Sequence, residues 1–176
     1  VIDKINEIIY RPIKEREISV SFKKKLDSSI SSDVAPNATM FLNFNYTNTP
    51  EKYVLKGSDT IVNYIHGNLD NPESVIFGYG DELDSSFVKL QNMNDNECLR
   101  HIKSIRYLES DNYRKMLDFI EADTFQVIII GHSCGNSDRT LLNTLFEHRN
   151  CVSIKPYYYV KEDGTLNIND ITDMLK

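Results

Sequence analysis

The residues best suited to chemistry form a small turn, Gly131-His132-Ser133-Cys134-Gly135, which is followed closely by Asp138. The turn ends the apolar run Phe125-Gln126-Val127-Ile128-Ile129-Ile130, which is typical of a fully buried strand. Gly131-x-Ser133-x-Gly135 matches the nucleophile elbow of serine hydrolases, in which the serine attacks a carbonyl carbon. A turn with a trailing Asp also suits a nucleotide, which binds at the carboxyl end of such a strand. The turn by itself therefore leaves two chemistries open.

The hydrolase interpretation requires a histidine base and an acid that orients this histidine. In elbow enzymes these partners follow the serine in the order acid, then histidine. His148 is the only histidine after Ser133, and it falls in the helix predicted to follow the turn. There it would point away from the carboxyl end of the strand. The plainer interpretation is that Ser133 and Gly135 shape a tight turn.

His66 is the most interesting titratable residue, because it follows a predicted strand over residues 61–65 and precedes Gly67. Histidine changes its charge close to neutral pH and can therefore serve as a general base. The structural alternative is a strand-end histidine that is hydrogen-bonded to the adjacent loop. A further polar turn, Asn45 to Glu51, follows the strand predicted over residues 38–44.

Strands, polar turns and helices alternate along the chain. Thr49 and Pro50 resemble the cap and the first residue of a helix, and Ser110-Asp111-Asn112 resembles the cap of a second helix. This alternation predicts an α/β fold with a mainly parallel, Rossmann-like sheet flanked by helices. The polar turns that end three of the strands should then converge at one edge of the sheet. The remaining predicted elements are a strand over residues 152–160 and helices over 99–108, 113–120 and 141–148.

Length and composition predict one globular domain. The 176 residues, of which 40% are hydrophobic and 26% charged, are enough for one sizeable core. The net charge of −6 argues against a general nucleic-acid surface, and Lys23-Lys24-Lys25 is interpreted as a solvated helix face. No apolar stretch reaches membrane-spanning length, and no secretory signal opens the chain. We therefore predict a protein that binds neither membranes nor nucleic acid in general.

The cysteines predict a reducing compartment. Cys98, Cys134 and Cys151 form an odd and widely spaced set, which favours the cytoplasm over a disulfide framework. Cys98 and His101 lie three residues apart, but a second ligand pair is missing, so we predict no metal site. The chain also lacks the glycine-rich Gly-x-x-x-x-Gly-Lys-Ser/Thr loop that holds phosphates in many nucleotide hydrolases.

Three ordered segments carry a family resemblance. Phe44-Asn45-Tyr46-Thr47, then Ile65-His66-Gly67, then Gly131-His132-Ser133 with the trailing Ser137-Asp138 together resemble the AbiH family of bacterial abortive-infection proteins. The resemblance covers residues 38–160 and implies a role in defence against phages. AbiH proteins are in turn distantly similar to sirtuin-like domains of antiphage systems, which bind or cleave NAD on a Rossmann-like sheet.

The sirtuin-like resemblance implies roles for individual residues. His66 corresponds to the catalytic histidine, and Asn45 to the asparagine that contacts the nicotinamide ribose. NAD is then a candidate substrate, with no other cofactor required, and an oligomer or a separate defence protein is a candidate partner. The residues implied to line the nucleotide pocket are Asn45, Tyr46, Thr47, Gly67, Gly131, His132, Ser133, Gly135 and Asp138.

Two departures from these families define the alternatives. Thr47 stands where the sirtuin-like turn has an Asp, and the amino-terminal glycine-rich loop and first strand of these families are missing. We interpret the chain as the carboxyl-terminal portion of a longer protein, with a helical segment at 1–36 and the Rossmann-like domain at 37–176. The leading hypothesis is NAD cleavage. The alternatives are a non-catalytic module that senses a nucleotide or a phage component, and the serine hydrolase.

Overall fold

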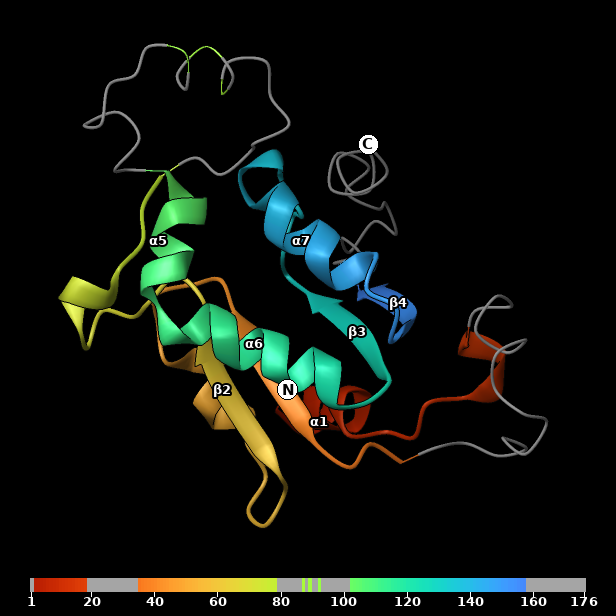
Figure 1. Cartoon of the computed structure of the whole chain (residues 1–176). Coiled ribbons are helices and arrows are strands. Elements are labelled where there is room, and N and C mark those ends of the chain that lie inside the picture. Colours follow the sequence, from red (N-terminus) through yellow and green to blue (C-terminus); the bar gives the residue numbers. More distant parts are fainter. Residues whose placement is uncertain are drawn as a thin grey trace, which may run out of the picture.

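The computed structural model describes residues 2–18, 35–78 and 102–157, together with the isolated positions 87, 89 and 92. Helices and strands alternate through these ranges (Figure 1). The α-helices are α1 (Ile2–Ile9), α5 (Lys103–Glu109), α6 (Asp111–Ala122) and α7 (Arg139–Phe146). The strands are β1 (Thr39–Asn43), β2 (Thr60–Tyr64), β3 (Phe125–Ile130) and β4 (Cys151–Tyr157). The short 3-10 helices are η1 (Glu15–Glu17), η2 (Thr49–Tyr53), η3 (Pro72–Ser74) and η4 (Asn136–Asp138).

The strands pair in parallel. β1 pairs with β2 in a register that runs from Thr39 opposite Thr60 to Asn43 opposite Tyr64. β3 pairs with β4 up to Ile130 opposite Tyr157, with an irregularity after Phe125. Parallel strands separated by helices confirm the α/β class. Within the described ranges the strands form two separate pairs, so a continuous Rossmann-like sheet stays a prediction.

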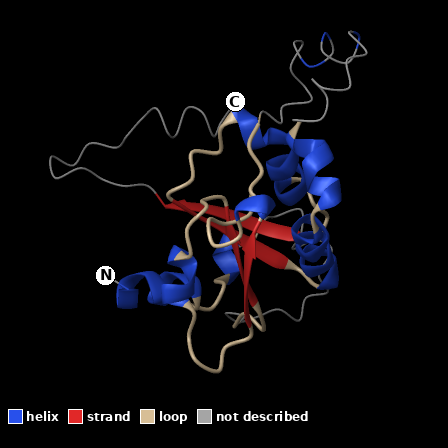
Figure 2. Cartoon of the chain, turned by 90° about the vertical axis from the view of Figure 1, so that its left-hand side faces the viewer, coloured by secondary structure: helices blue, strands red, loops and turns tan. Residues whose placement is uncertain are grey.

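Helices lie on both sides of these strands. Figure 2 shows the amino-terminal helix on one side and larger helices on the other. α6 packs against β2 and α7 against β4. α6 begins where the Ser110 hydroxyl accepts a hydrogen bond from the Asn112 amide, which confirms the predicted cap. The core cluster that these elements form consists of Ile65, Ile76, Tyr107, Met116, Ile120, Leu141 and Leu145.

Several local predictions need correction. Thr49 begins a short 3-10 helix after Asn48 and does not cap it, and Pro50 is the second residue. β3 is mostly half-buried, with only Ile129 buried and Ile130 46% exposed, because in the described ranges β3 pairs with β4 alone. α7 ends at Phe146, so His148 lies beyond the helix. The fourth strand begins at Cys151 and is described to Tyr157.

The amino-terminal segment contacts both strand pairs. The Tyr10 hydroxyl donates to the Tyr53 carbonyl at 3.1 Å and lies 3.3 Å from Oγ1 of Thr60, the first residue of β2. Glu17 accepts from Lys155 of β4 at 2.6 Å. The described part of the predicted 1–36 segment therefore packs on the remainder of the chain. The predictions for Lys23-Lys24-Lys25, Cys98 and His101 lie outside the described residues, as do residues 158–176.

No helix among the described residues is long and apolar enough to cross a bilayer.

Candidate functional site

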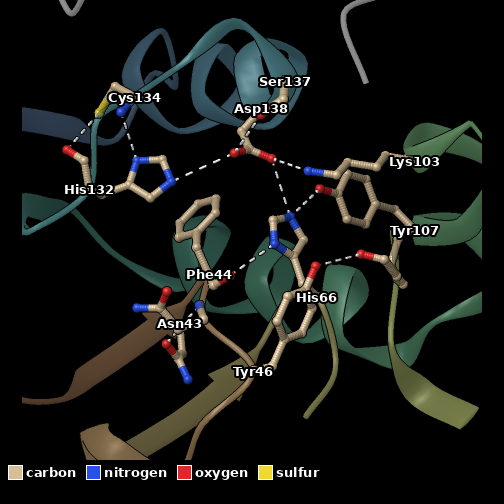
Figure 3. A network of polar contacts seen from close by, with 12 residues as sticks. Asn43, Phe44, Tyr46, His66, Lys103, Tyr107, His132, Cys134, Ser137 and Asp138 are labelled. Atoms are coloured by element: carbon tan, nitrogen blue, oxygen red, sulfur yellow. Dashed lines mark hydrogen bonds and ion pairs between the residues drawn. The ribbon is translucent and has the colours of Figure 1, made fainter. Parts of the chain in front are cut away.

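The three polar turns meet at one end of the strands, as predicted. Strand β1 is followed by the turn at Phe44 to Asn48, β2 by His66 and Gly67, and β3 by the turn that leads to Asp138. Nε2 of His66 lies 3.2 Å from Oδ1 of Asp138, which joins the second turn to the third. The rings of Phe44 and His132 are 4.1 Å apart between centroids, which joins the first turn to the third (Figure 3).

Asp138 is the centre of this site and is only 8% exposed. Its Oδ1 lies 2.9 Å from Lys103 Nζ as well as close to His66, while its Oδ2 faces His132 Nε2 at 3.7 Å and accepts from Ser137 Oγ at 3.2 Å. Burial acts to raise the pKa of Asp138. The contacts with His132, His66 and Lys103 outweigh it and hold the pKa well below its usual value. Asp138 is therefore an anion that buried cationic and polar groups surround.

His66 is 4% exposed, and both of its ring nitrogens are engaged. Nδ1 lies 3.1 Å from the Phe44 carbonyl oxygen, which can only accept, so Nδ1 carries a proton. Nε2 lies 2.8 Å from the Tyr107 hydroxyl. Burial and the charge of Asp138 raise the pKa of Tyr107, so its hydroxyl stays protonated and can donate to Nε2. Nε2 of the neutral ring thus accepts from Tyr107, and Asp138 Oδ1 lies 3.2 Å from the same nitrogen.

His132 is fixed in the opposite tautomer. The Cys134 amide donates to His132 Nδ1 at 2.9 Å, so the proton of the neutral ring lies on Nε2, which faces Asp138. Two left-handed residues shape this turn, Gly131 with φ +67° and Cys134 with φ +53°. The left-handed conformation costs a non-glycine residue such as Cys134 about 1–2 kcal/mol, which the surrounding contacts must offset.

The turn after β1 divides its predicted residues between surface and interior. The Asn45 and Thr47 side chains are exposed, whereas Tyr46 is half-buried and donates its hydroxyl to the Ile76 carbonyl at 3.3 Å. A residue that the sequence reasoning missed, Asn43, holds this turn. Asn43 is 7% exposed, its Nδ2 donates to the Thr47 carbonyl at 2.8 Å, and its Oδ1 accepts from the Asn45 amide at 3.1 Å.

The three predicted pocket glycines have different surroundings. Gly67 has φ +77°, and a Cβ at this position would overlap the backbone carbonyl of Ser74. Gly67 therefore allows the loop after β2 to approach the end of the strand. A Cβ on Gly131 would meet nothing within 4 Å, and one on Gly135 would lie 3.7 Å from Ser133 Oγ. The turn after β3 thus has free space beside its glycines, whereas the Ser74 backbone fills the space beside Gly67 in the turn after β2.

Helix α5 supplies two site residues that the sequence reasoning also missed. Lys103 and Tyr107 are 6% and 7% exposed and lie one helical turn apart, so they project from the same face. Lys103 contacts Asp138, and Tyr107 contacts His66. Their spacing was visible in the sequence, but nothing local connected it to the turns after β2 and β3.

The contacts of Ser133 do not support a hydrolase. No hydrogen bond joins Ser133 Oγ to an imidazole in the described part of the chain, and the residue is exposed. The His148 ring lies 5.7 Å from that of Phe125, the first residue of β3, and Nε2 contacts Glu121 at 3.2 Å. His148 therefore lies at the amino end of the strand, and Ser133 lies beyond its carboxyl end.

Contacts between side chains, rather than a metal cluster or a hollow, mark the site. Among the described residues, no group of three His, Cys, Asp or Glu side chains could hold a metal ion. A shallow hollow of about 610 Å³ lies elsewhere, beside Glu121, His148 and Arg149. The convergent contacts of the strand-end turns, rather than this hollow, identify the candidate site, because they unite buried groups that titrate and donate hydrogen bonds.

The chain matches a known protein family. A family model described as "Bacteriophage abortive infection AbiH" matches residues 2–159. No curated protein and no solved structure matches the chain.

Proposed function

Because the chain belongs to the AbiH family of bacteriophage abortive infection proteins, we propose that its strand-end site binds a nucleotide and cleaves NAD during that defence. The family match supports abortive infection as the broad function. The observation that carries the finer proposal is the convergence of three strand-end turns on the buried Asp138–His66 pair. In open α/β folds, ligands bind beyond the carboxyl ends of the parallel strands, where these turns lie.

The exposed part of the site suits a ribose and its phosphates. Asn45 offers a side-chain amide at the surface, and Ser133 offers a hydroxyl. Gly131 leaves open space beside the backbone of the turn after β3, so a ligand can approach that backbone closely. Below this polar surface lies Asp138, which repels phosphate but favours the cationic nicotinamide end of NAD. The proposed orientation therefore directs nicotinamide, rather than the phosphates, toward Asp138.

The proposed reaction is hydrolysis of the bond between nicotinamide and its ribose. The carbon–nitrogen bond breaks, neutral nicotinamide leaves with the bonding electrons, and a water oxygen bonds to the ribose carbon. The water proton passes to Nε2 of His66 and then to solvent, so NAD and water give ADP-ribose, nicotinamide and one proton. Such general base catalysis contributes typically about 10²–10⁴-fold.

This step requires a change at His66. In the ligand-free structure Tyr107 occupies Nε2, and His66 is 4% exposed. Tyr107 must rotate its hydroxyl hydrogen away before Nε2 accepts a proton. Asp138 then stabilises the imidazolium, because its Oδ1 lies 3.2 Å from Nε2.

A test compares two histidines in the whole protein. Purified wild type is incubated with NAD under conditions that activate defence, and free nicotinamide is measured by chromatography. We expect release by wild type, loss of at least about 10²-fold in His66→Ala and no loss in His148→Ala. His148 is the matched control because it lies at the other end of β3. No release by wild type, or equal release by His66→Ala, would overturn the proposed reaction.

A non-catalytic nucleotide sensor is the second candidate, and one observation favours it. Both ring nitrogens of His66 already have partners, and Thr47 brings no carboxylate to the turn after β1. A sensor would bind NAD without consuming it. Calorimetric binding of NAD to wild type, with no nicotinamide released over hours, would select the sensor over the enzyme.

A further inference from the structure

The half-buried ring of Tyr46 and the exposed ring of Phe77 form an aromatic pair beside the site, which we call the aromatic ledge. We propose that the planar heteroaromatic ring of a nucleotide stacks on this ledge, an inference that rests on the proposed nucleotide-binding function. Phe77 is 69% exposed, and its ring centroid lies 5.1 Å from that of Tyr46 with a tilt of 46°. An aromatic pair that keeps one face in water is the arrangement on which bases stack.

Backbone contacts hold the ledge in place. The Tyr46 hydroxyl donates to the Ile76 carbonyl, and the Tyr46 carbonyl accepts from the Leu69 amide at 2.9 Å. Ile76 is 3% exposed, and its amide donates to the His66 carbonyl at 2.9 Å. Phe77 follows Ile76 directly, so the hydrogen bonds of the Ile76 backbone also restrict the position of Phe77. The ledge is therefore built from two turns of the site, those that follow β1 and β2.

The ledge is continuous with the buried groups of the site. The centroid of the Tyr46 ring lies 6.3 Å from that of His66 (Figure 3). Burial, and secondly the negative charge of Asp138, raise the pKa of Tyr46. A ring stacked on Phe77 and Tyr46 would thus place its attached ribose beside His66.

The chemistry of the ledge favours one kind of ring. Any heterocycle gains from stacking, which typically strengthens binding by roughly 5- to 150-fold per base. A positively charged pyridinium ring, as in nicotinamide nucleotides, gains further from the aromatic faces and from Asp138. Neutral adenine gains stacking alone. We therefore expect nicotinamide mononucleotide to bind the ledge more tightly than AMP.

A fluorescent reporter tests the location. The 176 residues contain no Trp, so Phe77→Trp in this chain places an indole on the ledge that can be selectively excited. Titration with NAD, nicotinamide mononucleotide and AMP should quench its emission with saturation. Ile61→Trp is the matched control, because Ile61 is 42% exposed near the amino end of β2, away from His66. Its emission should stay unchanged at the same nucleotide concentrations.

Affinity measured by calorimetry completes the test. Phe77→Ala should weaken NAD binding by roughly 5- to 150-fold, whereas Leu108→Ala, which removes a side chain that is 76% exposed on α5, should leave it unchanged. A quench by either mononucleotide supports the ledge and identifies which ring occupies it. NAD binding that Phe77→Ala leaves intact, with no quench in Phe77→Trp, overturns the ledge alone. Absence of NAD binding to wild type overturns the proposed function as well.

Discussion

Lys103 Nζ lies 2.9 Å from Asp138 Oδ1, and both side chains are buried. This ion pair joins helix α5 to the turn after β3. It holds the Asp138 carboxylate, which His66 and His132 also face. Folding moves both charges out of water, which is unfavourable, and their attraction offsets this desolvation only while both partners are present. The ion pair therefore makes the site sensitive to the loss of either residue.

A double-mutant cycle measures this coupling. Asp138→Asn leaves the Lys103 ammonium buried without its counter-charge and should lower the free energy of unfolding by about 3–5 kcal/mol. Lys103→Met leaves Asp138 with His66 and His132 as partners and should cost less. The double variant should lose clearly less than the sum of the single losses in urea unfolding. Losses that add to within about 0.5 kcal/mol would show that the pair is not coupled.

Gly67 should tolerate no side chain. Gly67→Ala combines a left-handed backbone, at a cost of about 1–2 kcal/mol, with overlap between the new Cβ and the Ser74 carbonyl. Gly57→Ala is the control, because Gly57 has a similar φ of +83° but nothing within 4 Å of the new Cβ. Urea unfolding should show a larger loss of stability for Gly67→Ala. Equal losses would mean that the approach of Ser74 does not constrain the turn.

Substitutions of Asn43 and Asn45 should have different effects, the first on stability and the second on ligand binding. Asn43→Ala removes both hydrogen bonds that hold the turn after β1 and should lower the free energy of unfolding by about 1–3 kcal/mol. Asn45→Ala truncates an exposed side chain and should change stability by less than about 0.5 kcal/mol. Asn45→Ala should weaken NAD binding nonetheless. A large loss of stability in Asn45→Ala would assign that residue a structural role.

Glu17 should contribute to the acid sensitivity of the fold. Burial opposes ionisation, but hydrogen bonds from Arg11, Lys155 and Gln126 lower the pKa of Glu17 to about 2 from 4.5. A carboxyl whose pKa is depressed by folding contributes stability that is fully present above its unfolded pKa, and that is lost as pH falls through its folded pKa.

The measurable window therefore runs from about pH 4.5 down to about pH 2. Unfolding free energies of wild type should fall across this window more steeply than those of Glu17→Gln. Glu7→Gln, which changes an exposed carboxyl on α1, is the control. Parallel pH profiles for wild type and Glu17→Gln would contradict the prediction.

Ser133 should not behave as a hydrolase nucleophile. Its hydroxyl has no imidazole partner within the described ranges, so nothing there removes its proton at neutral pH. A fluorophosphonate probe should leave the protein unlabelled at Ser133, as judged by mass spectrometry of its peptides. Labelling that disappears in Ser133→Ala would contradict this and restore the serine hydrolase alternative.

The local elements were largely predictable from the sequence. The apolar run at β3 and the spacing of Met116 and Ile120 reveal a strand and a helix, because their side-chain periodicity is a local property. Ser110 identified a helix start for the same reason, since its partner is two residues away. Burial of β3 was overestimated, because exposure depends on neighbouring strands that a local pattern does not describe.

Sequence alone determined the α/β class, the three strand-end turns and the family. Only the tertiary structure decided which side chains meet there. Lys103 and Tyr107 reach Asp138 and His66 because α5 is packed at the carboxyl ends of strands far away in the chain. Periodicity is set by neighbours along the chain, whereas a buried ion pair depends on direction and distance between elements that only folding brings together.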